Sequence, residues 1–182
     1  MLRPFICLGL MFLVTASLAS GQSYTSDSGR VEFDSSVPLH SFTGTSNELV
    51  GRIVLADSTV DFYVDLETLD TGIGKRDKDM RKTLKTGDFP FAEFFGKLTS
   101  PFDPSGGQQP ARVSGRFSIR GVTKDIEVAG TLEPTADGLL LNAEWELNLN
   151  DYEIVPPKLL IMKVDPVQQL RISVTLLPES GT

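Results

Sequence analysis

Hydrophobic and polar residues alternate along much of this chain. In residues 59–66 every second residue is apolar, and most of the residues between them are polar. Residues 139–150 show the same alternation over a longer stretch, with Trp145 on the apolar side. A period of two is typical of a β-strand that buries one face and exposes the other. The pattern therefore predicts half-buried strands in both stretches.

Shorter stretches with the same character predict further strands. Their ranges are residues 29–34, 39–43, 49–56, 92–98, 112–120, 124–132 and 170–176, which gives about eight or nine strands in all. The connections are short and rich in Gly, Pro and Asp, which favours antiparallel neighbours over helical crossovers. Only residues 75–86 predict a helix, a short polar one with Met80 and Leu84 four residues apart.

Many strands with one apolar face form either a β-sandwich or a closed antiparallel barrel, and alternation alone does not choose between them. A membrane-spanning barrel is disfavoured by three features. The alternating runs are short, loop lengths do not alternate between short and long, and residues 178–182 lack a terminal aromatic strand. We therefore expect a soluble all-β domain.

The first residues have the pattern of a signal peptide. After Arg3, residues 5–14 form an uninterrupted apolar run that is too short to span a bilayer and suits a signal-peptide core. The small residues Ala19 and Gly21 predict cleavage after Gly21, with cleavage after Ala19 as the alternative. We expect residues 1–21 to be removed and residues 22–182 to form one exported domain, in the periplasm or outside the cell.

Composition and charge narrow the possible partners. The chain has 182 residues, with 24 Asp and Glu against 17 Lys and Arg, for a formal net charge of −7. This acidic balance offers no basic footprint for nucleic acid or an anionic membrane surface. The single cysteine, Cys7, lies in the predicted signal peptide, so no disulfide is expected and the core must supply the stability. No membrane span is expected, and the sequence does not choose between a monomer and a dimer.

Residues that carry enzyme chemistry are sparse. His40 is the only histidine, so there is no histidine cluster for zinc, and a hydrolytic triad would have to be built around that one imidazole. The acidic pair Asp77 and Asp79 lacks the spacing of an EF-hand loop, and a solvated helix face explains it better. We therefore expect no enzyme, no catalytic residue and no metal site.

The apolar faces of the predicted strands are rich in aromatic residues. In a closed barrel these side chains either fill the interior or leave one elongated apolar cavity, and the pattern is compatible with both. An apolar lumen would suit a lipid tail, because each buried CH₂ contributes about 0.8 kcal/mol. Strand parity and the helix place nine candidate lining residues inside: Phe62, Val64, Leu66, Met80, Phe94, Phe117, Ile119, Trp145 and Leu147.

Two blocks of the sequence resemble the YceI-like family of exported lipid-binding proteins. The first contains the turn LDTG at residues 69–72, the dipeptide RD at residues 76–77 and the segment FPFAEF at residues 89–94. The second is the hairpin turn IRGVTK at residues 119–124. With the outer strands, the resemblance extends over about residues 29–177.

The resemblance implies an eight-stranded antiparallel, lipocalin-like barrel with one short helix. Its lumen is expected to bind a polyisoprenoid or a similar amphiphilic, quinone-like lipid, without catalysis and without another cofactor. The nine lining residues are then the expected ligand-binding residues. The alternative is a periplasmic stress or interaction protein whose barrel has a filled core and no ligand.

The two blocks also carry local structural expectations. Gly72 and Gly121 lie where the chain reverses, so positive φ angles are expected there. Arg76 and Asp77 are expected to cap the short helix and to attach it to the barrel wall through a charge-assisted bond. The helix would then cover one mouth of the barrel.

Overall fold

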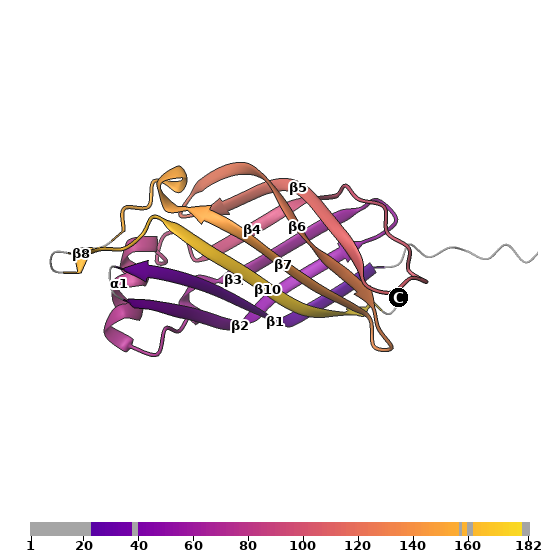
Figure 1. Cartoon of the computed structure of the whole chain (residues 1–182), viewed down its shortest axis with the longest axis horizontal. Coiled ribbons are helices and arrows are strands. Elements are labelled where there is room, and N and C mark those ends of the chain that lie inside the picture. Colours follow the sequence, from indigo (N-terminus) through magenta and orange to yellow (C-terminus); the bar gives the residue numbers. More distant parts are fainter. Residues whose placement is uncertain (1–22, 38–39, 157, 160–161, 180–182) are drawn as a thin grey trace, which may run out of the picture.

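The computed structural model describes residues 23–37, 40–156, 158–159 and 162–179. The predicted signal peptide lies outside the described residues. Eight strands close into an antiparallel barrel (Figure 1). They are β1 (Ser23–Val37), β2 (His40–Val54), β3 (Thr59–Asp65), β4 (Phe91–Leu98), β5 (Gln109–Ile119), β6 (Val122–Pro134), β7 (Leu139–Asn148) and β10 (Val167–Pro178).

Strands β1 to β7 follow one another around the barrel, and β10 fits between β7 and β1 to close the sheet. The predicted all-β, eight-stranded antiparallel barrel is confirmed, and the sandwich is excluded. The chain also forms the helix α1 (Gly74–Leu84) and the 3₁₀ helices η1 (Leu66–Thr68) and η2 (Leu149–Tyr152). A small separate hairpin consists of β8 (Lys158–Leu159) and β9 (Met162–Lys163). None of the helices in this described part has the length and apolar character that a membrane crossing requires.

Two features of the strand prediction were wrong. The two short strands expected at residues 39–43 and 49–56 are one continuous strand, β2, which pairs with β1 from Ser23–Val54 to Val37–His40. Polar residues between the two stretches hide this continuity, because a backbone ladder does not require apolar side chains. The β8–β9 hairpin was not predicted either, since four paired residues are too few to show a period.

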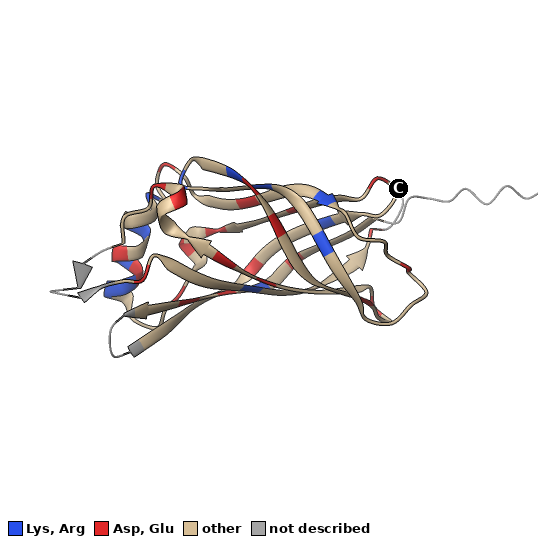
Figure 2. Ribbon diagram, turned by 45° about the horizontal axis from the view of Figure 1, so that its top comes forward, with Lys and Arg blue, Asp and Glu red and all other residues tan. Residues whose placement is uncertain are grey.

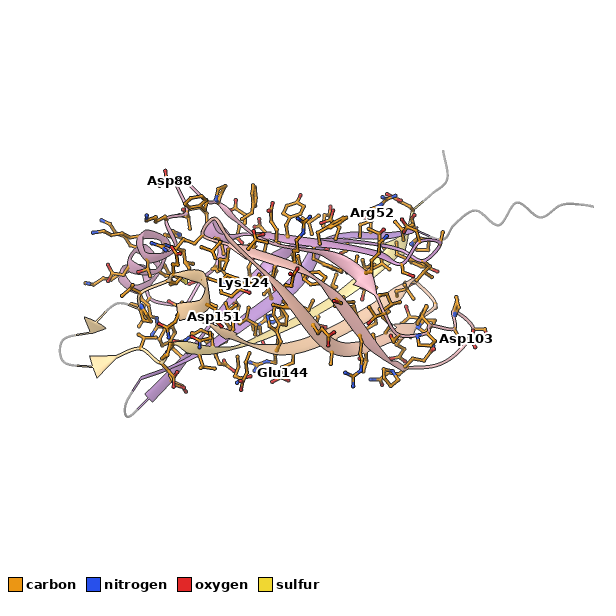
Figure 3. The ribbon with its side chains drawn as sticks, turned by 90° about the horizontal axis from the view of Figure 1, so that it is seen from above. Arg52, Asp88, Asp103, Lys124, Glu144 and Asp151 are labelled. Atoms are coloured by element: carbon orange, nitrogen blue, oxygen red, sulfur yellow. The ribbon has the colours of Figure 1, made fainter. Side chains whose placement is uncertain are left out.

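Alternation within the strands separates an apolar interior from a charged exterior. Ile53, Leu132, Leu139 and Leu176 are among the most deeply buried side chains. Charged side chains such as those of Arg52, Lys124 and Glu144 extend from the outside of the molecule (Figure 3). At the chain reversals, Gly72 and Gly121 have φ angles of 77° and 76°, which confirms the expected positive φ at both positions.

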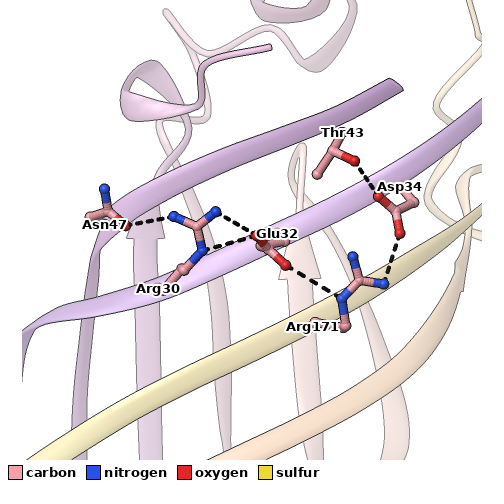
Figure 4. A network of polar contacts seen from close by, with 6 residues as sticks. All are labelled: Arg30, Glu32, Asp34, Thr43, Asn47 and Arg171. Atoms are coloured by element: carbon pink, nitrogen blue, oxygen red, sulfur yellow. Dashed lines mark hydrogen bonds and ion pairs between the residues drawn. The ribbon is translucent and has the colours of Figure 1, made fainter. Parts of the chain in front are cut away.

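The seam where β10 meets β1 carries a polar network on its outer side (Figure 4). Arg171 of β10 lies 2.7 Å from the carboxylate of Asp34 and 3.4 Å from that of Glu32, both on β1. Arg30 pairs with the other oxygen of Glu32 at 2.5 Å, and Thr43 of β2 donates a hydrogen bond to Asp34. The network links the strands on both sides of β1.

Candidate binding site in the barrel lumen

Two apolar cavities lie inside the barrel. The first, the helix-end cavity, has a volume of about 160 Å³ and lies beneath α1. The second, the distal cavity, has a volume of about 100 Å³ and lies in the other half of the lumen. The interior is therefore not fully packed by side chains, in contrast to the dense core of an ordinary domain.

A ring of five residues separates the two cavities and lines both of them. We call this ring the waist: it consists of Val31, Val64, Ala92, Phe117 and Leu170, from five different strands. Because the same side chains form a wall of each cavity, the two cavities lie end to end along the lumen.

Glycines on the inner wall leave room for the phenylalanine rings. Phe33 pairs with Gly44 across β1 and β2, and Phe62 pairs with Gly51 across β2 and β3. In both pairs a Cβ built on the glycine would overlap the ring. Each ring therefore lies against the wall in space that a side chain would otherwise take, which leaves the lumen emptier than the aromatic content suggests.

All nine predicted lining residues border the lumen. Six of them border the helix-end cavity: Val64, Leu66, Met80, Phe117, Ile119 and Leu147. Five border the distal cavity: Phe62, Val64, Phe94, Phe117 and Trp145. Val64 and Phe117 belong to both sets because they form part of the waist. The structure thus brings the nine together around one lumen, and their ligand-binding role remains a prediction.

The helix-end cavity is capped by two segments. Met80, Thr83 and Leu84 of α1 border it from one side, and Ile154, Pro156 and Val164 border it from the segment between β7 and β10. Tyr152 of that segment packs edge-on against Phe117, with 5.6 Å between ring centroids. Burial raises the pKa of the Tyr152 hydroxyl, with a smaller contribution from Asp151. The phenol therefore stays neutral.

A buried polar cluster holds the start of α1. The amide and hydroxyl of Thr71 both donate to one oxygen of Asp77, at 2.9 and 2.5 Å. The Thr71 hydroxyl accepts a hydrogen bond from Nε of Arg76 at 2.8 Å. The backbone carbonyl of Thr71 accepts a second hydrogen bond from the same guanidinium. Burial acts to raise the pKa of Asp77, but the two Thr71 bonds and the nearby Arg81 and Arg76 hold it below its usual value.

The expected capping by Arg76 and Asp77 was wrong. Ile73 is the N-cap residue, and no side chain caps the helix. The attachment to the barrel does exist, but by another route, since the guanidinium of Arg76 lies 4.0 Å from the ring centroid of Phe42 on β2. Asp77 supports the loop before the helix instead of the helix end, because it accepts from Thr71.

Residues 24–176 match the YceI-like domain, which is most of the chain and runs from within β1 to within β10. The chain belongs to the YceI-like family. No curated protein matches this YceI-like chain significantly in sequence. The resemblance seen in the two sequence blocks is thus confirmed by the family match.

Solved structures share the fold of this YceI-like barrel. A polyisoprenoid binding domain from Saccharophagus degradans aligns with a TM-score of 0.73 at 17% identity, over 86% of this chain and 98% of its own. BcnA from Burkholderia cenocepacia aligns with a TM-score of 0.67 at 13% identity, over 81% and 94%. A YCEI protein from Campylobacter jejuni gives 0.56 at 14% identity, over 98% and 92%. At these identities the likeness concerns the fold.

Sequence reasoning missed several residues of this YceI-like lumen. Val31 and Leu170 lie on the inner wall, and their strand parity could have identified them. Ile154 and Val164 come from an irregular segment without a period, so no pattern marks them.

Among the described residues, no group of three or more His, Cys, Asp or Glu could hold a metal ion. The backbone of His40 pairs with Val37, and its side chain lies outside the described part.

Proposed function

We propose that this YceI-like barrel binds the hydrocarbon chain of a polyisoprenoid or a similar quinone-like lipid in its lumen, without covalent chemistry. The observation that carries the proposal is the pair of apolar cavities that lie end to end on either side of the waist. Most of the lining side chains are hydrocarbon, so the lumen suits a ligand whose buried part is largely apolar. The helix-end cavity also has polar residues in its wall, which are Ser35, Arg76, Asp79, Thr83 and Gln168. The structural likeness to a polyisoprenoid binding domain supports the same ligand class.

The cavity sizes limit how the ligand enters. An apolar cavity of about 150 Å³ holds one benzene molecule and stays dry when empty. The helix-end cavity, at about 160 Å³, thus accommodates one small branched segment of a chain. A longer chain must pass the waist and use the distal cavity too, so binding is expected to move Phe117 or Leu170.

Ligand uptake can be followed through the single tryptophan of the chain. Trp145 borders the distal cavity and packs edge-on against Phe117 of the waist. We expect an added prenyl alcohol to change its emission, and an added prenyl quinone to quench it. Native mass spectrometry of the same sample should show the protein with one lipid bound. If neither probe binds the delipidated protein, and the protein from its host carries no lipid, the proposal fails.

A matched pair of variants locates the ligand. Ala92→Leu adds bulk at the waist, where the alanine is buried between both cavities, and is expected to weaken uptake at least tenfold. Ala136→Leu makes the same change in the exposed turn between β6 and β7 and should leave uptake unchanged. Equal affinity in the two variants would place the lipid outside the lumen.

We further propose that the protein is exported and cleaved after Gly21. The apolar run and the small residues before Gln22 support this proposal. The intact mass of the protein from a periplasmic or extracellular fraction should match a chain that begins at Gln22, or at Ser20 if cleavage follows Ala19. A cytoplasmic protein with its full mass would contradict it.

A further inference from the structure

The lysines of this acidic chain are concentrated at one end of the molecule. Six of its eight lysines lie either in α1 and its C-cap or in the β8–β9 hairpin, and Figure 1 shows α1 and β8 at the same end of the barrel. The six are Lys75, Lys78, Lys82, Lys85, Lys158 and Lys163. The net charge of −7 conceals this local concentration.

The lysines of α1 share the face that points away from the lumen. An α-helix turns once in about 3.6 residues, so Lys75, Lys78 and Lys82 lie along one side and the cavity-lining Met80 and Leu84 along the opposite side. Lys78 and Lys82 are exposed, as is Lys85 at the C-cap. Figure 2 shows this basic helix at the end of the barrel.

These lysines are largely free of partners. Lys75 pairs with Asp79 at 3.0 Å, whereas Lys78, Lys82 and Lys85 form no ion pair with any residue that the structure describes. Asp88 and Asp151 are exposed at the same end (Figure 3). The attraction for an anionic surface would therefore come from the lysine face of α1 and not from the net charge of this end.

Two exposed apolar residues lie next to the segments that cap the helix-end cavity. Ile73, directly before α1, is 53% exposed, and Val155 in the opposite capping segment is 78% exposed. Lysines beside exposed apolar residues are the combination that binds an anionic bilayer surface, where the charge attracts and the apolar side chains partition.

We propose that this end of the molecule, formed by α1, Ile73 and Val155, docks on the surface of a bilayer that contains anionic lipid. The helix-end cavity lies directly beneath α1, so docking brings the capped mouth of the lumen to a lipid reservoir. Attraction to the surface does not require an occupied lumen. The inference therefore goes beyond lipid binding and is tested separately from it.

Sedimentation with vesicles tests the proposal. At low ionic strength the full mature protein should bind phosphatidylcholine vesicles that contain phosphatidylglycerol, and bind pure phosphatidylcholine vesicles far more weakly. Each basic residue near such a surface contributes about fivefold to the partition coefficient. The triple variant K78E/K82E/K85E should therefore bind the anionic vesicles at least about a hundredfold more weakly. Added salt should weaken binding of the unaltered protein, because it screens these charges.

A matched variant controls for net charge. R112E/R116E/K124E changes the total charge by the same amount, at three exposed positions on β5 and β6, and should keep binding within a few-fold. K78Q/K82Q/K85Q, which places no acidic residue near the helix C-terminus, should also lose binding. I73S/V155S should weaken it while leaving the charge unaltered.

The outcomes separate the two proposals. All of these variants should take up a prenyl lipid from detergent solution as the unaltered protein does. Equal vesicle binding by K78E/K82E/K85E and R112E/R116E/K124E, or no preference for anionic vesicles, would overturn the docking proposal. If the unaltered protein takes up no prenyl lipid but still binds anionic vesicles, the proposed function is overturned and the docking proposal is not.

Discussion

The ring of Phe62 on β3 occupies the space that a side chain on Gly51, its partner on β2, would need. Gly51→Ala should therefore push the ring toward the distal cavity. Overpacking of this kind destabilises a protein by about 1–3 kcal/mol, and the displaced ring should also weaken lipid uptake. Urea unfolding and Trp145 fluorescence measure the two effects.

The control for this change is Gly87→Ala. Gly87 is exposed, no atom lies within 4 Å of an added Cβ, and its φ is not positive. The free energy of unfolding should stay within about 0.5 kcal/mol of its original value, and uptake should not change. If the Gly51→Ala protein is as stable as the Gly87→Ala protein and takes up as much lipid, the ring of Phe62 has room elsewhere.

Shortening Leu170 should join the two cavities at the waist. Leu170→Ala is expected to lower the free energy of unfolding by about 2 kcal/mol, at the low end for a core leucine because this side chain is only partly buried. The joined lumen should shift the preference toward longer chains in a series of prenyl alcohols compared by native mass spectrometry. Leu177→Ala, on the exposed side of β10, should change neither stability nor preference. An unshifted preference in Leu170→Ala would mean that the waist does not limit chain length.

Asp77 is expected to stabilise the protein except at strongly acidic pH. Its pKa is lowered in the folded protein, so its contribution is complete above its usual pKa and is lost as the pH falls through the lowered value. Asp77→Ala leaves the Thr71 donors unpaired and should cost about 1–3 kcal/mol at neutral pH. Unfolding measured from about pH 5 down to about pH 2 should show a smaller loss of stability in the variant than in the original protein.

The neighbouring Asp79→Ala serves as a comparison on the same helix. Asp79 is half-buried and pairs with the exposed Lys75, a contact worth less than about 1 kcal/mol. Asp79→Ala should therefore lose as much free energy of unfolding between about pH 5 and about pH 2 as the original protein does. If both variants behaved alike, the buried bonds of Thr71 would not be the source of the effect.

Arg171 should lower the pKa of two carboxyl groups at the β1–β10 seam, those of Asp34 and Glu32. Its hydrogen bond is the main cause of the lowered pKa of Asp34, and it adds to the effect of Arg30 on Glu32. Arg171→Gln should raise the pKa of Asp34 more than that of Glu32, as measured by NMR titration of the carboxyl groups. The stability change should be below about 1 kcal/mol, because the network faces solvent. A larger shift at Glu32 than at Asp34 would contradict the geometry.

Alternation predicted which residues of each strand face inward, whereas the closed barrel was expected from the resemblance of two sequence blocks to the YceI-like family, because alternation fits a sandwich as well. Once Phe117 faces inward, Ile119 must do so as well, and the same rule applies to Trp145 and Leu147. The inner-wall positions of eight of the nine candidates follow from this parity, and the ninth, Met80, was placed by the predicted helix. The rule says nothing about the long β2 strand, whose polar middle pairs through its backbone.

The remaining features depend on which residues meet across the barrel. The waist brings together residues 31, 64, 92, 117 and 170, and only the register of five strands shows that they form one ring. The Thr71–Asp77 bonds link a loop to a helix and follow no period. The basic face of α1 was hidden by the acidic total, since net charge contains no information about position.

The pairing of β1 with β10 makes the barrel a late product of chain synthesis. β10 ends at Pro178, and until it is available β1 and β7 both have an open edge. The first described strand pairs with the last one, so their contacts join residues that are far apart in the sequence. Such long-range contacts raise the contact order and favour slow folding. During that interval the chain has two unpaired edges that can join other strands. The newly made protein is therefore most prone to aggregate before its C-terminal strand arrives.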